Sequence, residues 1–277
     1  MADHILTTKL GKVEYSLFGI GQPILFIHGG HSNSCEGLAT KGFDLKKYQL
    51  IIPSRPGYGN TLLDDHKTPR KAADLLIALI DEISIDEIVV YGISAGGLTA
   101  IELAANYPER VKKLVLASAI SKKWLNRDDK IYRKAQIIFN PKYQKWTWSM
   151  VRIFSRLLPN LIGKSFHPQF SKKPYPIIES NDVQELIHAL KKYDSGEGFV
   201  NDLEQTIDES TLERIECPTL IIHSEYDNSV PFEHAINARD KIKGSVLECL
   251  TNEWGHLFWI GRDSDDSIKK TLYFIEG

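Results

Sequence analysis

The segment Val89–Gly97 constrains the fold of this chain more than any other stretch. An apolar run leads into a G-x-S-x-G pattern at Gly92, Ser94 and Gly96, and a helix-like stretch follows. In this context the serine is expected at a sharp strand-to-helix turn, in a strained backbone conformation that lifts its hydroxyl clear of a sheet. The two glycines allow the strand and the helix to cross closely. A chance Gly/Ser turn is the alternative, because three fixed letters are common.

Short apolar runs alternate with helical patterns on both sides of this turn. Strands are predicted at residues 13–18, 23–28, 48–52, 87–91, 113–118, 218–223 and 245–250. Helices are predicted from Pro69, after a Thr68 cap, and at about 96–106, 232–242 and 268–275. The alternation implies a doubly wound α/β fold, with a mostly parallel central sheet flanked by helices. Its site is expected in the loops at the carboxyl ends of the strands.

This rhythm lapses between residues 121 and 212. The stretch is rich in aromatic residues and lacks buried-strand runs, so we predict a mostly helical insertion. It would form a lid (cap) domain over a core made of residues 1–120 and 213–277, by analogy with the fold. Its aromatic side chains would either pack the lid onto the core or favour an apolar acyl or aromatic substrate.

Charge is divided unevenly within the lid. Residues 122–173 contain 13 Lys and Arg against two acidic residues, whereas residues 174–216 contain 11 acidic residues and three basic ones. Two halves of opposite sign would attract each other or form solvated faces. The alternative hypothesis is that the basic half attracts an anionic substrate or an anionic surface.

Bulk composition excludes several classes of function. A formal net charge of -2 gives no general attraction to nucleic acid, so no nucleic-acid partner is expected. Cys35, Cys217 and Cys249 make neither a metal-type pair nor a disulfide framework, which suits a reducing compartment. The start of the chain lacks a signal-peptide core, and no apolar run is long enough to span a membrane. We expect a cytoplasmic protein without an integral membrane segment, and no pattern specifies its oligomeric state.

A serine nucleophile needs a base, and the base needs a group that orients it. On such a fold these residues follow the serine in the order acid, then histidine. Asp227 lies in the loop after the strand at 218–223 and is the predicted acid; Glu225, nearer the strand end, is the alternative. His256 follows the last predicted strand and is the predicted base.

The remaining histidines are predicted to be structural. His223 lies within a strand and His234 at a helix start, so both are expected to be core or surface residues, while His28 is expected to pack or hydrogen-bond locally. The negative charge that develops on the substrate oxygen needs two backbone N–H donors. We assign them to Ala95, which follows the nucleophile, and to Gly30 in the loop after an early strand.

Together these residues resemble the α/β-hydrolase fold superfamily, in the group that carries a lid. The resemblance rests on the 28–30 loop, the 54–61 loop, the 92–97 elbow, Asp227 and His256, and it covers about residues 10–120 and 213–277. It implies a serine hydrolase, carboxylesterase-like, that cleaves a small or medium ester, thioester or related acyl bond through an acyl-enzyme. It implies no cofactor and no metal, and it implies a small-molecule acyl substrate. Arg55, within the 54–61 loop, is expected to brace that loop.

Departures from subfamily patterns narrow this reading. Haloalkane dehalogenases and epoxide hydrolases have an aspartate where this chain has Ser94. Proline iminopeptidases resemble the chain around Gly29 and Gly30 but usually have a Trp-containing elbow. Carbon-carbon bond hydrolases, like this chain, have small residues in the elbow. A carbon-carbon bond hydrolase or a proline iminopeptidase-like enzyme is therefore the alternative function. A ligand-binding regulator with slow hydrolysis, on the same fold, is the alternative of another class.

The anion hypothesis for the basic half of the lid is testable by salt dependence. Added salt screens attraction between separated charges. Hydrolysis of a carboxylate-bearing ester is therefore expected to fall with salt much more than hydrolysis of a neutral ester of the same length. Equal salt responses in steady-state kinetics would remove the hypothesis.

Overall fold

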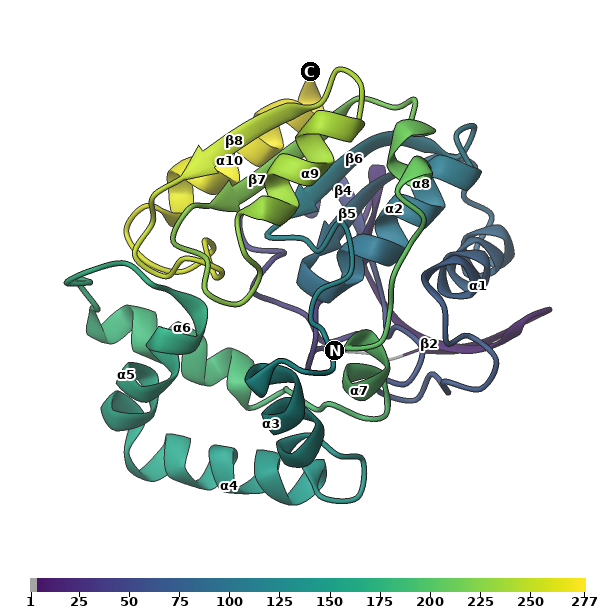
Figure 1. Ribbon diagram of the computed structural model, residues 1–277. Coiled ribbons are helices and arrows are strands. Elements are labelled where there is room, and N and C mark those ends of the chain that lie inside the picture. The colour runs from purple at the N-terminus through teal and green to yellow at the C-terminus, as the bar shows by residue number, and fades with distance from the viewer. Residues whose placement is uncertain (1–3) are drawn as a thin grey trace.

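An eight-stranded sheet forms the centre of the computed structural model, which describes residues 4–277 (Figure 1). Its order is β1-β2-β4-β3-β5-β6-β7-β8. The strands are β1 (His4–Thr8), β2 (Gly11–Gly19), β3 (Gln22–Ile27), β4 (Tyr48–Pro53), β5 (Ile88–Ile93), β6 (Val111–Ala117), β7 (Thr219–Ser224) and β8 (Val246–Leu250). The six strands from β4 to β8 in this order are parallel, whereas β1 and β2 pair antiparallel at one edge. The predicted mostly parallel α/β sheet is confirmed.

Helices cover both faces of this sheet. The helices α1 (Pro69–Glu82), α2 (Gly97–Asn106) and α9 (Glu233–Lys241) share one hydrophobic cluster with the sheet. The opposite face packs against α10 (Ser264–Glu276) and the segment 258–259. Because both faces are covered, a central strand such as β5 is buried at all six positions. This explains why these strands are continuous apolar runs in the sequence.

Local signals explain where α1 begins. The Thr68 side chain accepts a hydrogen bond from Lys71 N, and Pro69 occupies the first turn, as the sequence predicted. The edge strand β1 was not predicted. Four of its five residues are at least partly exposed, so it lacks the apolar run that marks a strand buried on both faces.

Six helices lie between β6 and β7, in the stretch predicted to be a helical lid. They are α3 (Lys130–Ile138), α4 (Gln144–Leu157), α5 (Pro159–Phe170), α6 (Ser180–Leu190), α7 (Gly198–Asp202) and α8 (Ser210–Glu213). In Figure 1, α3 to α6 form a layer beside the core, at the bottom of the view, whereas α8 returns to pack on α2. We call residues 121–212 the helical segment; its division from the core as a separate lid domain stays a prediction. Among residues 4–277, no helix combines the length and the apolarity needed to cross a bilayer.

The turn from β5 into α2 is as tight as the G-x-S-x-G pattern predicted. Ser94 has φ of 48°, in the left-handed region that L residues rarely adopt. A methyl group added to Gly92 would lie 2.4 Å from Ala100 Cβ, and one added to Gly96 would lie 2.3 Å from Ile27 O. Only glycine fits at these two positions, because strand and helix cross at backbone distance.

A substitution that adds this methyl group should measure the tightness of the crossing. Gly96→Ala is expected to lower the free energy of unfolding by about 1–3 kcal/mol, because its Cβ would overlap a fixed backbone carbonyl. Gly37→Ala is the control, since a Cβ there would meet its nearest atom at 3.7 Å. Urea denaturation should show a change within about 0.5 kcal/mol for this control. Equal midpoints for the two variants would contradict the close crossing.

Candidate active site

Ser94 lies where β5 ends, at the first residue of the short 3-10 helix η1 (Ser94–Gly96). Its side chain is partly exposed, while the residues around it are buried. The loop after β3 lies close to Ser94: a methyl group added to Gly29 would lie only 2.9 Å from Ser94 Cβ. The Ser94 carbonyl accepts a hydrogen bond of 3.0 Å from Ile120 N. The strained turn is thus held from two sides.

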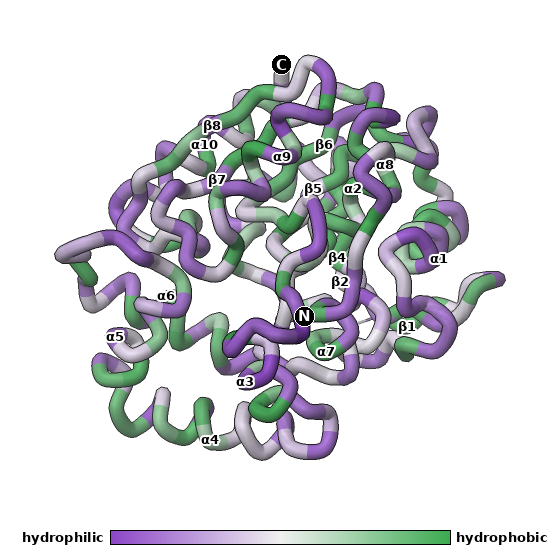
Figure 2. The backbone as a smooth tube through the Cα atoms, viewed as in Figure 1, coloured by the Kyte–Doolittle hydropathy of each residue, from purple (hydrophilic) through white to green (hydrophobic). Residues whose placement is uncertain are grey.

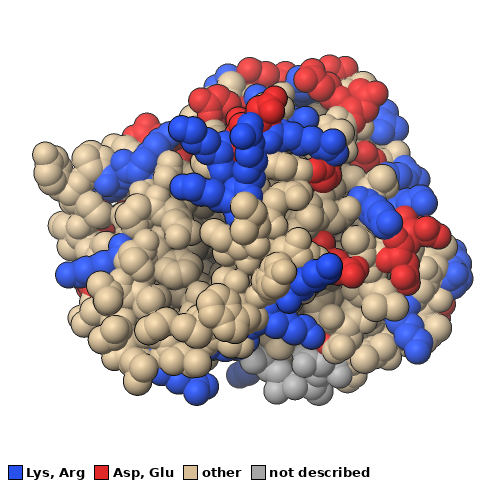
Figure 3. Space-filling view, turned by 60° about the horizontal axis from the view of Figure 1, so that its bottom comes forward, with Lys and Arg blue, Asp and Glu red and all other residues tan. Residues whose placement is uncertain are grey.

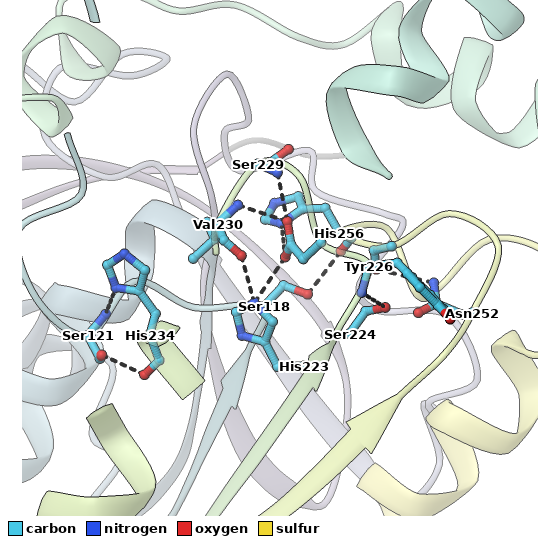
Figure 4. A network of polar contacts seen from close by, with 12 residues as sticks. Ser118, Ser121, His223, Ser224, Tyr226, Ser229, Val230, His234, Asn252 and His256 are labelled. Carbon is cyan, nitrogen blue, oxygen red and sulfur yellow. Dashed lines mark hydrogen bonds and ion pairs between the residues drawn. The ribbon is translucent and has the colours of Figure 1, made fainter. Parts of the chain in front are cut away.

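Asp227 lies in the loop after β7 and is buried. Its Oδ1 accepts hydrogen bonds of 2.8 Å from the backbone N–H groups of Ser229 and Val230. Its Oδ2 lies 2.7 Å from Nδ1 of His256, which follows β8 (Figure 4). These contacts fix the carboxylate on both oxygens and aim one of them at the imidazole.

The charge of Asp227 determines which nitrogen of His256 carries a proton. Burial alone would raise the pKa of Asp227, but His256 and His223 together outweigh it and lower the pKa to about 2. The carboxylate is therefore ionised at neutral pH and can only accept hydrogen bonds. Nδ1 of His256 must then be the donor, which leaves the lone pair of a neutral imidazole on Nε2.

His223 is a second histidine on the same carboxylate. Its Nε2 lies 2.9 Å from Val230 O and 3.1 Å from Asp227 Oδ2. Both neighbours are acceptors, so Nε2 carries the proton and donates to them. The sequence prediction of a core or surface residue left the burial of His223 open and did not include this contact. The only available signal was the spacing of four residues between His223 and Asp227 across a strand end.

Backbone contacts position His256. Its N–H donates to Phe170 O at 2.9 Å, and its carbonyl accepts a hydrogen bond of 3.0 Å from Ser118 Oγ. Phe170 O also accepts a hydrogen bond of 3.1 Å from Asn228 N, in the Asp227 loop. One carbonyl at the end of α5 therefore holds the acid loop and the base loop together. Before His256, Gly255 has φ of 51°, and a methyl group there would lie 2.6 Å from Phe170 O.

The other candidates lie away from this pair. Glu225, the alternative acid, is exposed, and its N–H pairs with Leu250 O in the neighbouring strand. His234 is buried and its Nδ1 accepts a hydrogen bond from Ser121 N, while burial and then Lys122 lower its pKa to about 4. Neither residue lines the cavity to which Ser94 and His256 contribute.

His28 and Arg55 join the loop after β3 to the 54–61 loop. Nδ1 of His28 lies 2.7 Å from Gly29 O, and Nε2 accepts a hydrogen bond from Arg55 N, which confirms its local role. Arg55 Nε donates to His28 O, and its two terminal nitrogens pair with both oxygens of Asp202 at 2.8 and 2.7 Å. Burial alone would lower the pKa of Arg55, but Asp202 outweighs it and raises it. Arg55 thus braces its loop, as expected, and also ties it to α7.

Four of the five predicted site residues line a cavity of about 570 Å³. Ser94, Ala95, Gly30 and His256 all contribute to its wall, and Asp227 lies behind His256. The hydrogen bonds of residues 4–277 include none between the Ser94 hydroxyl and His256. Gly30 has no room for a side chain, because a methyl group there would lie 2.9 Å from Phe199 Cδ2.

Most of the cavity wall is apolar, and half of its lining residues come from the helical segment. Its aromatic side chains are Trp259, which follows β8, and seven from the helical segment, namely Trp124, Phe139, Trp148, Phe166, Phe170, Tyr193 and Phe199. His31, which the sequence did not single out, stacks on Phe199 with ring centroids 3.8 Å apart. Burial lowers its pKa to about 3, so its ring is neutral, and Nδ1 lies 2.8 Å from Ser195 Oγ. The position of His31 directly after Gly30 was the signal that could have found it.

Comparisons with known proteins identify the family to which this fold belongs. A family model described as the alpha/beta hydrolase fold matches residues 22–263. An uncharacterized hydrolase of Bacillus subtilis, YcgS, is 40% identical over 277 residues, which are 98% of this chain and 97% of that protein. A solved alpha/beta hydrolase fold protein from Nakamurella multipartita superposes with a TM-score of 0.82 at 25% identity, covering 99% and 98% of the two chains. An esterase from Exiguobacterium antarcticum has the same fold, with a TM-score of 0.72 at 21% identity and coverage of 99% and 100%.

The depressed pKa of Asp227 predicts an acid-sensitive contribution to stability. Its pKa of about 2 in the folded protein lies below the unfolded value of about 3.9. The stabilisation is therefore present above about pH 4 and is lost as pH falls toward 2. Between pH 6 and pH 3 this group should account for about 1 kcal/mol of the loss.

Urea denaturation at these two pH values checks this prediction. Between pH 6 and pH 3 the free energy of unfolding of Asp227→Asn should fall by about 1 kcal/mol less than that of the wild type. Glu225→Gln is the matched control, since it removes an exposed carboxylate two residues away and should behave as the wild type. An acid loss in Asp227→Asn equal to that of the wild type would contradict the pairing.

Proposed function

The chain is a hydrolase of the α/β-hydrolase family, and from that premise we propose that it is a cofactor-free serine hydrolase. Its substrate is a small or medium ester, thioester or related acyl compound, which it cleaves through an acyl-enzyme. One observation carries the proposal: the 2.7 Å contact between His256 and the ionised Asp227, on the cavity to which Ser94 also belongs. A base oriented in this way is what a serine hydroxyl needs to become a nucleophile at neutral pH.

In the first half of the reaction, Ser94 Oγ attacks the acyl carbon while His256 Nε2 takes the hydroxyl proton. The carbonyl oxygen becomes negative and accepts hydrogen bonds from the N–H groups of Gly30 and Ala95. The imidazolium is stabilised by Asp227, which stays ionised. The tetrahedral intermediate then collapses, and His256 gives its proton to the leaving alcohol or thiol.

The second half repeats these steps with water. His256 Nε2 takes a proton from a water molecule whose oxygen attacks the acyl carbon on Ser94. The new tetrahedral intermediate collapses, the carbon–oxygen bond to Ser94 breaks, and His256 returns the proton to the serine oxygen. The products are a carboxylic acid and the regenerated enzyme, so no redox partner or metal is required by the balance of atoms and charge.

The walls of the cavity support an apolar acyl group as substrate. Aromatic and aliphatic side chains of the helical segment line the space in front of Ser94. We propose that residues 121–212 act as the lid over this space, and that substrate chain length is selected there. A reducing cytoplasm suits the protein, since Cys217 and Cys249 form no disulfide among residues 4–277.

A panel of p-nitrophenyl esters from acetyl to decanoyl tests the proposal. The wild type is expected to hydrolyse at least part of the series, and Ser94→Ala to lower kcat by about 10³-fold or more. Ser165→Ala, at an exposed serine of α5, is the matched control and should keep full activity. Ester hydrolysis that survives in Ser94→Ala at the wild-type rate would refute the assigned nucleophile.

A further inference from the structure

The helix α4 presents an apolar face to solvent as well as one to the protein. Trp148 and Ser155, seven residues apart, are buried toward the protein. On the opposite side Trp146, Ile153 and Leu157 are spaced seven and four residues apart, and they are 70%, 49% and 68% exposed. A helix at the surface of a protein in water usually carries polar residues on this side. In Figure 2 stretches of hydrophobic colour alternate with hydrophilic ones along α4, which lies at the outer edge of the molecule in Figure 1.

The same apolar surface continues onto the neighbouring helices. Exposed aliphatic side chains also occur at Ile137 and Ile138 of α3 and at Leu161 of α5. The three helices are consecutive: α4 packs on α5, and Thr147 Oγ1 of α4 donates a hydrogen bond to Ile138 O at the end of α3. The exposed side chains of α3, α4 and α5 form what we call the docking face, which is made of Ile137, Ile138, Trp146, Ile153, Leu157 and Leu161. An apolar surface spread over three helices marks an interaction site more than scattered exposed residues do.

Positive charge accompanies the docking face. Lys145 and Arg156 directly precede Trp146 and Leu157 in the sequence, and both are exposed. Within residues 4–277 no ion pair involves Lys142, Lys145, Arg156 or Lys164. Residues 122–173 hold 13 Lys and Arg against two acidic residues, and only Arg127 among these bases pairs with the acidic half of the helical segment, at Glu204. Figure 3 turns this side forward and shows wide uncharged areas bordered by blue side chains.

The combination of groups specifies the partner. Trp146 and the aliphatic side chains suit the boundary between lipid headgroups and acyl chains, and flanking Lys and Arg can extend to phosphate groups. Each such base near an anionic surface adds attraction. A second copy of the chain would bring a face of the same positive sign, which would repel. We propose that the docking face binds the surface of an anionic membrane.

The entrance to the cavity lies beside the docking face. Ile131, Lys134 and Ile138 of α3 are exposed, and the same three residues line the cavity that holds Ser94. A lipophilic ester dissolved in the membrane would therefore meet residues of the cavity wall next to the docking face. This part of the inference, which assigns a membrane-partitioned acyl ester as the substrate class, rests on the proposed function, whereas membrane binding does not.

Vesicle co-sedimentation tests the binding. The wild type is expected to bind vesicles with about one third phosphatidylglycerol in phosphatidylcholine at least tenfold more strongly than pure phosphatidylcholine vesicles. Salt near 1 M, where the Debye length is about 3 Å, should remove most of that difference. Trp146→Glu combined with Leu157→Glu should lower binding to the anionic vesicles at least tenfold. Lys145→Glu combined with Arg156→Glu should also lower binding to the anionic vesicles at least tenfold, and it should leave binding to pure phosphatidylcholine vesicles unchanged.

The controls separate the docking face from general hydrophobicity and from catalysis. The control variant combines Ile20→Glu with Tyr273→Glu. These two residues lie outside the helical segment and are 68% and 81% exposed, and the variant should bind vesicles as the wild type does. The Trp146 and Leu157 variant should keep hydrolysis of p-nitrophenyl acetate without vesicles, since neither residue lines the cavity. Ser94→Ala should bind vesicles normally, so a failure of the proposed chemistry leaves the binding result intact.

Three outcomes would overturn the inference. They are equal binding to the two kinds of vesicle, an equal loss in the Ile20 and Tyr273 control, and no vesicle binding by the wild type. If the wild type binds no vesicles and is a dimer by analytical ultracentrifugation, while the Trp146 and Leu157 variant is a monomer, the face is an interface between copies instead.

Discussion

At Gly96 the chain passes so close to the end of β3 that an added methyl group would lie 2.3 Å from Ile27 O. The position of Ser94 depends on this crossing. Because strand and helix meet at backbone distance, the turn between them is short, and Ser94 takes a φ of 48°. The same closeness brings Gly29 against Ser94 Cβ, so the loop proposed to supply one N–H donor already lies beside the proposed nucleophile. The strain is local, and the buried strands around it supply the stability that maintains it.

The helical segment does more than line the cavity. Its Phe170 carbonyl accepts hydrogen bonds from Asn228 N and His256 N, and so it joins the loops that carry the acid and the base. Its Asp202 forms a buried, two-point ion pair with Arg55, which in turn holds the carbonyl of His28. Movement of this segment would therefore disturb the alignment of His256 as well as the cavity wall. The proposed membrane contact on α4 lies on the same segment.

Much of the fold could be predicted from the sequence, because strands buried on both faces are continuous apolar runs and α1 carries its own cap at Thr68. The pairing of Asp227 with His256 followed from their order after two strands. The second histidine on Asp227, the Asp202 partner of Arg55 and the Phe170 carbonyl were not predicted, since they depend on long-range backbone geometry that periodicity does not record. The outward face of α4 was missed for another reason. Its aromatic residues were assigned to packing or substrate binding, and only the structure separates Trp146, which is exposed, from Trp148, which is buried.

The central claim is that Ser94 becomes covalently acylated during turnover, and trapping that intermediate tests it most directly. The enzyme would be mixed with a p-nitrophenyl ester, quenched in acid within the first turnover, digested, and its peptides analysed by mass spectrometry. We predict one acyl group per chain, located on Ser94, and no acylation in Ser94→Ala. Acylation of a different residue, or steady release of product with no acylated peptide at any quench time, would contradict the claim.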